Sequence, residues 1–382
     1  MARPIFYLRR GDRLIARMKH VLYGWRFARQ AGGKAVVLWP PPGPWRQFDS
    51  MEYSPSLIFD LEEMAREATI SDLTFVETSE RFPERRRSLR DPEFAKMRNN
   101  SFDREYFKQD DLVFHEDSLM QYRFSDEQRS IAALNAELSD LFNRLKLHPA
   151  VEAGLARVAN DLGTEKYASL HVRAGDVFHM LTTELPLLPQ GKLTGQALKR
   201  LLGHYVTRTA PPELYTPWVL KSIETGQKLV FATDSPDQIE FFYKRFGAQH
   251  FLNLADYHLD FPIQKALMDF IVLSRGSVLY GPRSNFSSLA CALGNIDLVT
   301  VSAANVTNLQ PDEVIRLYTE QAIAKFLPRD ANNSAAIDYL AERISQHYKY
   351  VNRLGTKAQI DAMDPRRSGP ADLKPISFPG KT

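Results

Sequence analysis

The sequence contains one cysteine, Cys291, among its 382 residues, so no disulfide can form within the chain. This cysteine lies in the apolar run 289–293, which predicts a buried structural thiol and a reducing compartment. No apolar stretch approaches the roughly 18 residues that a membrane span needs, and the N-terminus lacks the long apolar core of a signal peptide. We therefore expect a cytoplasmic protein.

An excess of charge of one sign is also missing, because 49 lysines and arginines face 46 aspartates and glutamates, for a formal net charge of +3. Binding nucleic acid through its phosphates calls for a strongly basic surface, so we expect no nucleic-acid partner. The arginine run at 81–90 has two interpretations: a weak peripheral contact with a membrane or an acidic glycan, and a solvated loop. Glu80, Glu84 and Asp91 favour the loop.

Several familiar catalytic motifs are absent as well. The sequence has no Gly-x-Gly-x-x-Gly, no Walker loop, no Gly-x-Ser-x-Gly and no His-Glu-x-x-His. Its histidines also lack metal-ligand spacing. These absences argue against dinucleotide redox chemistry, P-loop hydrolysis and zinc proteolysis.

Length and hydrophobic periodicity predict an α/β protein of two domains. The first part forms a βαβ unit, with a strand at 4–8, a helix at 13–31 and a strand at 34–39. A capping box at Ser125–Gln128 predicts the start of a long helix that Pro149 ends, followed by a shorter helix.

The second half alternates strands and helices, which predicts a second Rossmann-like domain with a parallel sheet. Its strands are expected at 167–172, 228–233, 250–254, 277–280 and 297–301, with helices after Ser235, after Pro262 and at 286–293, the last stopped by Gly294. Helices at 313–326 and 335–348 are expected to pack across the domain junction. The predicted divisions are 1–150, 151–310, 311–359 and a loose tail at 360–382.

Polar residues follow the predicted central strand of the second domain, in the segment His171–Asp176. Ligands of open α/β sheets bind beyond the carboxyl ends of the strands, so Arg173 is expected to face a ligand. Its guanidinium presents a fork of donors that matches phosphate oxygens, and Gly175 lets the backbone come close. The alternative is an Arg173–Asp176 pair that only closes the loop.

Two further strand ends place polar residues at the same edge. Asp234 and Ser235 follow one strand, while Ser284, Ser287 and Ser288 lie at the start of the helix after another. Backbone N–H groups at a helix start, with hydroxyls nearby, form a natural phosphate cradle. Each loop alone is interpreted as a helix cap, whereas three on one edge of a sheet predict a binding site.

These segments occur in a distinctive order: His171-Val-Arg-Ala-Gly-Asp176, then Ala232-Thr-Asp234, then Asp269-Phe-Ile-Val-Leu-Ser274 leading to Ser284-Asn-Phe-Ser-Ser288. They resemble the motifs of the α1,2, α1,6 and protein O-fucosyltransferase superfamily, which includes bacterial Nod-factor fucosyltransferases. The opening Leu8–Leu14, which contains Gly11, is similar to that group's first strand and glycine loop. The resemblance covers the first 40 residues and about 165–295.

The resemblance implies a GT-B fold, in which two Rossmann-like domains with parallel sheets face a central cleft. It implies a glycosyltransferase of bacterial glycan biosynthesis that uses GDP-fucose as donor substrate and needs no cofactor. The donor-binding residues that it implies are Gly11, His171, Arg173, Asp234, Ser235, Asp269, Asn285, Phe286, Ser287 and Ser288. Arg173 matches the arginine that holds the β-phosphate, and Asp269 matches the acid that reads the guanine ring.

The chemistry of the bond indicates the mechanism. Breaking a sugar–phosphate link builds negative charge on the departing diphosphate, which calls for a fixed positive charge, supplied by Arg173. Attack by an acceptor hydroxyl from the opposite face inverts the anomeric centre, and a carboxylate takes the proton. The resemblance implies Glu184 as this base, because related α1,6 enzymes carry a carboxylate in the equivalent loop, here 181–185. The alternative is a solvated loop glutamate, and Asp176 and Asp12 are the reserve candidates for the base. The sequence has no Asp-x-Asp to hold a nucleotide-bound cation, so we expect a metal-independent reaction.

Two departures from the family pattern keep other functions open. Ala174 follows Arg173 where α1,6 members carry a second arginine, and Gly11 stands alone in the opening loop. One alternative is a GT-B transferase with another donor, such as ADP-heptose. The other is a catalytically inactive module that binds a glycan or nucleotide. The acceptor is expected to be a glycan or glycolipid that binds to the first domain, 1–150, while the second domain, 151–310, is expected to bind the nucleotide-sugar.

Overall fold

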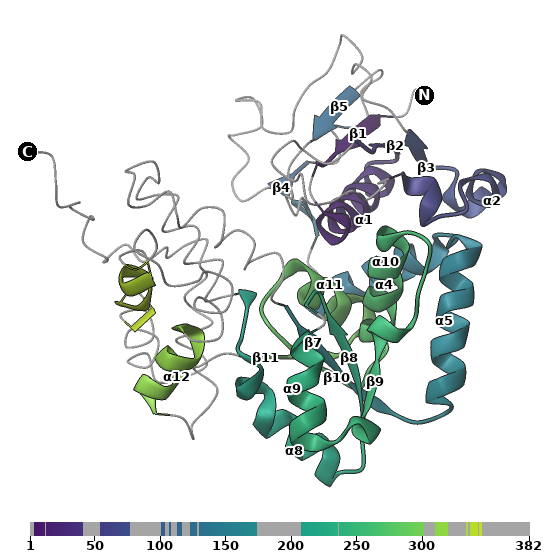
Figure 1. Ribbon diagram of the computed structural model, residues 1–382. Helices are drawn as coiled ribbons and strands as arrows, with labels where there is room; N and C mark the ends of the chain where they lie inside the picture. The colour runs from purple at the N-terminus through teal and green to yellow at the C-terminus, as the bar shows by residue number, and fades with distance from the viewer. Residues whose placement is uncertain are drawn as a thin grey trace, which may run out of the picture.

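The computed structural model in Figure 1 describes residues 4–11, 13–40, 54–76, 101–103, 107, 113–116, 123–127, 130–173, 208–235, 237–301, 310–319, 334, 337–342 and 344–345. Asp12, Asp176, Glu184, the arginine run at 81–90 and the tail at 360–382 lie outside the described residues. The described residues form two larger sheets in which all neighbouring strands run parallel. The predicted α/β class with two parallel sheets is confirmed.

The first sheet has the strand order β3-β2-β1-β5. Its strands are β1 (Ile5–Arg9), β2 (Lys34–Leu38), β3 (Leu73–Val76) and β5 (Val113–Glu116). Helix α1 (Leu14–Gln30) joins β1 to β2 and completes the predicted βαβ unit. Smaller elements lie between these strands in the chain: the turns Pro55–Leu57 and Ala68–Ile70, α2 (Leu61–Arg66) and β4 (Ser101–Phe102). β6 (Arg123–Phe124) follows β5 and pairs with β4.

The second sheet has the order β11-β10-β7-β8-β9, with β7 at its centre. Its strands are β7 (Tyr167–Val172), β8 (Lys228–Thr233), β9 (Phe251–Asn253), β10 (Val278–Gly281) and β11 (Asp297–Thr300). The helices around it are α8 (Thr216–Glu224), α9 (Asp237–Phe246), α10 (Pro262–Ser274), α11 (Asn285–Gly294) and α12 (Pro311–Leu317). The strand predictions at 167–172 and 228–233 are confirmed at both ends.

Two helices connect the sheets, and the predicted start of the first was wrong. Helix α4 (Ile131–Arg144) is capped by Ser130, whose hydroxyl accepts from the N–H of Ala133 at 3.1 Å. Ser125 lies in a turn after β6, where its N–H donates to the carbonyl of Phe102 at 2.8 Å. Helix α5 (Pro149–Leu162) is as long as α4, and Pro149 begins it at a position where a helix needs no N–H donor.

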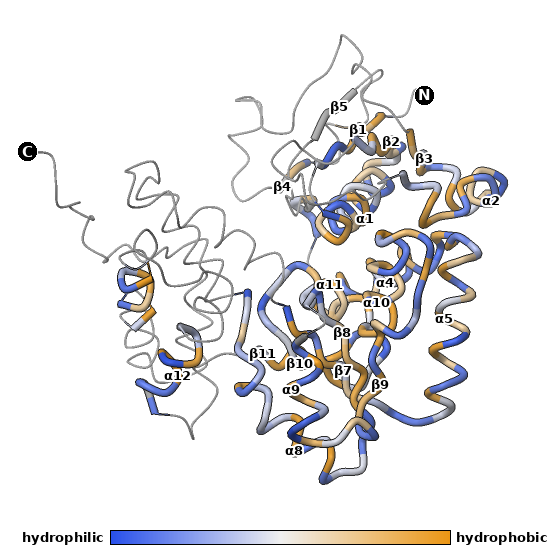
Figure 2. Tube along the Cα trace, in the orientation of Figure 1, coloured by the Kyte–Doolittle hydropathy of each residue, from blue (hydrophilic) through white to orange (hydrophobic). Residues whose placement is uncertain are grey.

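The faces of β7 separate two apolar cores. Ala168, Leu170 and Val172 belong to a cluster that includes residues of α8 and α9. The residues between them point to the opposite face, which α10 and α11 cover. Figure 2 shows hydrophobic colouring concentrated in the strands of this sheet, as expected for a parallel sheet covered on both faces.

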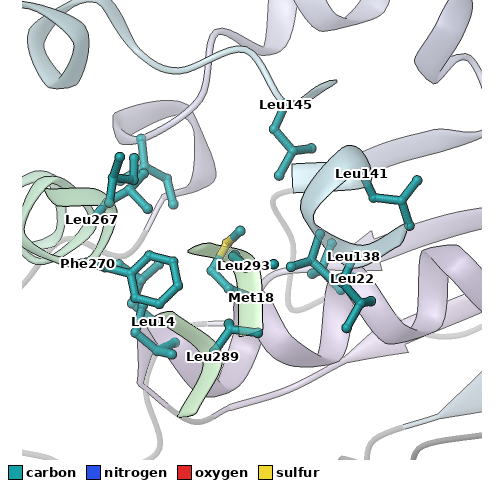
Figure 3. Packing of buried hydrophobic residues seen from close by; sticks show 14 of the residues in the cluster. Leu14, Met18, Leu22, Leu138, Leu141, Leu145, Leu267, Phe270, Leu289 and Leu293 are labelled. Atoms are coloured by element: carbon teal, nitrogen blue, oxygen red, sulfur yellow. The ribbon is translucent and has the colours of Figure 1, made fainter. Parts of the chain in front are cut away.

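The larger core is continuous between the two sheets. Leucines, Met18 and Phe270 from α1, α4, α10 and α11 interleave in it (Figure 3), and Met18, Leu22 and Leu138 are 0% exposed. Figure 1 shows α1 lying between the first sheet and the helices of the second. The orientation of the two sheets is therefore set by packing of buried side chains.

The end of α11 differs from the prediction. Gly294 is the last helical residue, and the left-handed residue that ends the helix is Asn295, at φ 50°. A Cβ on Gly294 would lie 1.8 Å from the carbonyl oxygen of Ser274 at the end of α10. Glycine is required there because two helix ends approach each other closely.

The C-terminal helical residues that the structure describes pack on the second sheet. Val314 and Tyr318 at α12, with Ile337, Leu340 and Ile344, are buried in the cluster of β7, α8 and α9. Packing of the 311–359 segment across the domain junction, like the domain bounds themselves, stays a prediction.

Candidate functional site

The register of the second sheet brings three loops to one edge. Val172 at the end of β7 pairs with Thr233 at the end of β8, and Leu170 pairs with Tyr280 near the end of β10. Because these strands are parallel, the residues that follow them leave the sheet on the same side. The structure therefore brings Arg173, Asp234 and Ser284 to a common edge, as the sequence predicts.

His171 is the buried centre of this edge. Its side chain is 7% exposed, and its Nδ1 lies 2.9 Å from the hydroxyl of Ser287 on α11. Phe286 packs against the imidazole at 4.8 Å between ring centroids. The main-chain carbonyl of His171 accepts a hydrogen bond of 3.0 Å from the hydroxyl of Tyr215. His171 is thus held through both its ring and its backbone.

The start of α11 has the features of an anion-binding helix end. Ser284 caps it, its hydroxyl accepting from the N–H of Ser287 at 3.1 Å and lying 3.2 Å from the Ser287 hydroxyl. The first turn contains no acidic residue. Asn285 and Ser288 are exposed beside this cap, whereas Ser287 is fully buried. The helix dipole and these polar groups favour a phosphate in front of the helix.

The other two loop ends differ in exposure. Arg173 is half-buried and Asp234 is exposed, while Ser235 is 6% exposed. Ser235 is fixed by Thr233, whose hydroxyl accepts from its N–H at 3.0 Å and donates to its carbonyl at 3.2 Å. The last residue of β8 therefore shapes the turn that presents Asp234.

Asp269 occupies a different place from the loop residues, in the middle of α10. Its carboxylate pairs with Lys265 one turn earlier. Burial raises the pKa of this carboxyl above its usual range, and the Lys265 charge lowers it by less. The next residue, Phe270, packs edge-to-face on Phe286 at 5.5 Å, so α10 supports the ring that lies on His171. The guanine-reading role of Asp269 stays a prediction.

The first sheet approaches this site at the start of α1. Leu14, the first residue of that helix, lies beside Phe270 and Leu289 in the shared core (Figure 3). The loop before it contains Gly11, which is exposed and where a Cβ would meet nothing within 4 Å. Packing does not require glycine at that position, and its donor-binding role stays a prediction.

Sequence reasoning missed Tyr215, and it included Phe270 in the motif 269–274 without assigning it a role at the site. Tyr215 follows two prolines in a short turn, Pro212–Tyr215, and no motif or periodicity marks it. A signal for the polar face of β7 did exist, because Tyr167, Ser169 and His171 alternate with apolar residues. All three make hydrogen bonds on the face that α10 and α11 cover.

The catalytic carboxylates expected at Glu184, Asp176 and Asp12 lie outside the described residues, so their roles stay predictions. The described part of the chain contains no group of three or more His, Cys, Asp or Glu side chains that could hold a metal ion. Among the described helices, none is both long and apolar enough to cross a membrane. Cys291 is buried, as expected, and burial raises the pKa of its thiol to about 12.

Comparison with known proteins gives matches at the level of structure. No protein-family model and no curated protein sequence matches the chain. The fucosyltransferase NodZ from Bradyrhizobium aligns with 81% of this chain and 98% of its own at 14% identity and a TM-score of 0.45. POFUT1 in its apo form aligns with 78% of this chain and 97% of its own at 11% identity and a TM-score of 0.42.

A third matching structure is a variant of Arabidopsis thaliana FUT1 in complex with GDP. It covers 78% of this chain and 70% of its own at 11% identity, with a TM-score of 0.43. Other matching NodZ structures were soaked with GDP-fucose or co-crystallised with GDP. The NodZ structures among these matches are described as fucosyltransferases.

Proposed function

We propose that this chain is an inverting, metal-independent glycosyltransferase that moves fucose from GDP-fucose to a hydroxyl of a glycan or glycolipid. One observation carries the proposal: β7 and β10 end at the same edge of the sheet, where Arg173 follows β7 and α11 follows β10, and the ring of His171 bonds to Ser287 on α11. A guanidinium beside an acid-free helix start is suited to a diphosphate.

The reaction needs little more from the second domain than this positive charge. The acceptor oxygen forms a bond to the anomeric carbon while the bond from that carbon to the β-phosphate oxygen breaks. GDP leaves with the bonding electrons, and the charge that grows on its β-phosphate strengthens the interaction with Arg173. The acceptor proton passes to a carboxylate, for which Glu184 is our candidate.

Calorimetry with GDP, UDP and ADP tests the donor class. We expect GDP to bind and the other two to bind much more weakly, whereas preferential binding of ADP would support the ADP-heptose alternative. Release of GDP from GDP-fucose in the presence of lipopolysaccharide, chitooligosaccharide or peptide then tests for transfer. Binding of GDP without turnover on any acceptor would instead indicate a binding module.

Arg173→Ala is expected to reduce transfer by about three orders of magnitude or more, because a charge that stabilises the leaving group is lost. Arg144→Ala provides the control, since Arg144 lies on α4 and pairs with Asp140 at 2.7 Å. Initial rates and thermal unfolding of both variants are to be compared with the parent. An Arg173→Ala protein with the parental rate would remove Arg173 from the mechanism.

A further inference from the structure

The backbone of His171 has a partner that neither the motifs nor the proposed mechanism explains. Tyr215 is 0% exposed in the apolar cluster that contains Ala168, Leu170 and Val172 of β7. Its hydroxyl donates to the carbonyl oxygen of His171 at 3.0 Å. This carbonyl lies one residue before the end of β7, and Arg173 follows directly after that end. This hydrogen bond therefore fixes the end of β7, directly before Arg173.

We propose that Tyr215 is a positioning residue, whose hydroxyl fixes the end of β7 so that Arg173 is held toward the diphosphate of the donor. This inference rests on the proposed function. Tyr215 acts through the backbone and does not itself touch the donor.

The surroundings of His171 show that this attachment is specific. The ring is held on the α10 and α11 face by Ser287 and Phe286. On the β10 side, Gly281 leaves the carbonyl open, because a Cβ there would lie 3.2 Å from the His171 oxygen and 3.1 Å from its Cβ. Tyr215 belongs to the apolar cluster on the opposite face of the sheet, so side chains from both faces contact His171.

The hydroxyl of Tyr215 is unfavourable in its environment without this bond. The ring packs among Phe242 and other apolar residues, and a phenylalanine would fill the same space without burying a polar group. Burial, with smaller contributions from Tyr318 and Asp234, raises the pKa of this phenol well above its usual value. The phenol therefore remains a hydrogen-bond donor across the physiological pH range.

Tyr215→Phe removes the bond and keeps the ring, and Tyr167→Phe is the matched control. Tyr167 begins the same strand, and its hydroxyl donates to the carbonyl of Val272 on α10 at 2.6 Å. Both variants lose one buried bond between tyrosine and a carbonyl. With GDP-fucose as donor, we expect kcat to fall about ten-fold in Tyr215→Phe, with KM within about two-fold, and kcat to be unchanged in Tyr167→Phe.

A cycle with Arg173→Lys tests whether Tyr215 acts through the arginine. Lysine keeps the charge and loses the planar fork, so positioning by the strand end should matter less. We expect Tyr215→Phe to lower kcat about ten-fold in the parent and less than about two-fold in the Arg173→Lys background. An equal reduction in both backgrounds would overturn the proposed route.

Amide hydrogen exchange gives a readout that does not depend on turnover. We expect faster exchange at residues 171–173 in Tyr215→Phe and parental exchange there in Tyr167→Phe. Parental exchange or parental kcat in Tyr215→Phe would overturn the inference. A parent protein that binds GDP-fucose without turnover would instead refute the proposed function, and the exchange data would still decide whether Tyr215 holds the strand.

Discussion

Some of the residues at this site can be identified from the sequence, and others only from the folded structure. His171 and Arg173 were predicted because they lie at the end of a run with strong strand character, where parallel sheets bind ligands. Tyr215 lies far from them in the chain, and only the folded structure shows its bond to His171. A side chain that acts through a tertiary hydrogen bond is not marked by any local sequence pattern, so sequence reasoning did not identify Tyr215.

Asp269 allows a prediction about pH at this scale. A carboxyl whose pKa is raised by burial binds its proton more tightly in the folded state than in the unfolded state. Its stabilising contribution is complete below the unfolded pKa, about 3.9, and is lost as the pH rises through the folded value. Asp269→Asn has no such proton, so its unfolding free energy should rise relative to the parent between pH 4 and pH 7.

Urea unfolding of both proteins at several pH values in this range measures the difference. The Asp140→Asn variant is the control, because Asp140 is also in an ion pair one turn apart on a helix but is 59% exposed. A difference between Asp269→Asn and parent that does not change with pH would contradict the prediction.

Whole strands and helices were predicted better than their ends. Strands β7 and β8 were predicted to the residue. β8 contains the apolar run 229–232 between Lys228 and Thr233, whereas in β7 Ser169 and His171 alternate with apolar residues. The start of α4 was wrong by several residues, since Ser125 and Ser130 are both plausible caps and only the pairing of Ser125 with β4 separates them. Helix caps are chosen by tertiary contacts as well as by local sequence.

The caps of α4 and α11 provide a matched pair of variants. Ser284→Ala and Ser130→Ala each remove a serine hydroxyl that accepts from a backbone N–H at 3.1 Å. We expect each to lower the unfolding free energy by about 1 kcal/mol. Calorimetry should show weaker GDP binding only for Ser284→Ala, because only α11 starts at the proposed diphosphate site. Equal GDP affinity in both variants would show that the start of α11 does not contribute to GDP binding.

At the scale of the molecule, sequence reasoning predicted two parallel sheets but not the core that joins them. The apolar stripes of α1, α4 and α11 each predict burial, and none of them identifies its partner. In the structure Leu22 and Leu138 lie together with Leu293 nearby in the shared core (Figure 3). Pairing of apolar stripes is a property of the whole chain, which explains why it was not read from separate segments.

We expect the two sheets to unfold in one transition for this reason. Leu22→Ala, which truncates a side chain that is 0% exposed, should lower the unfolding free energy by about 2–5 kcal/mol. In a Trp218→Phe background the remaining tryptophans all precede residue 46 and report on the first part of the chain. Their fluorescence and the far-ultraviolet circular dichroism should give coincident urea curves. Two separated curves would show that the sheets unfold independently.

The continuous core also limits how the two halves of this chain can be exchanged with those of other proteins. A chimera that joins a foreign first half to this second half would leave the leucines of α11 against a surface that did not evolve with them. Such hybrids should aggregate unless the buried faces of α1 and α4 are transplanted as well. Grafting single surface loops onto the intact chain leaves these buried contacts in place.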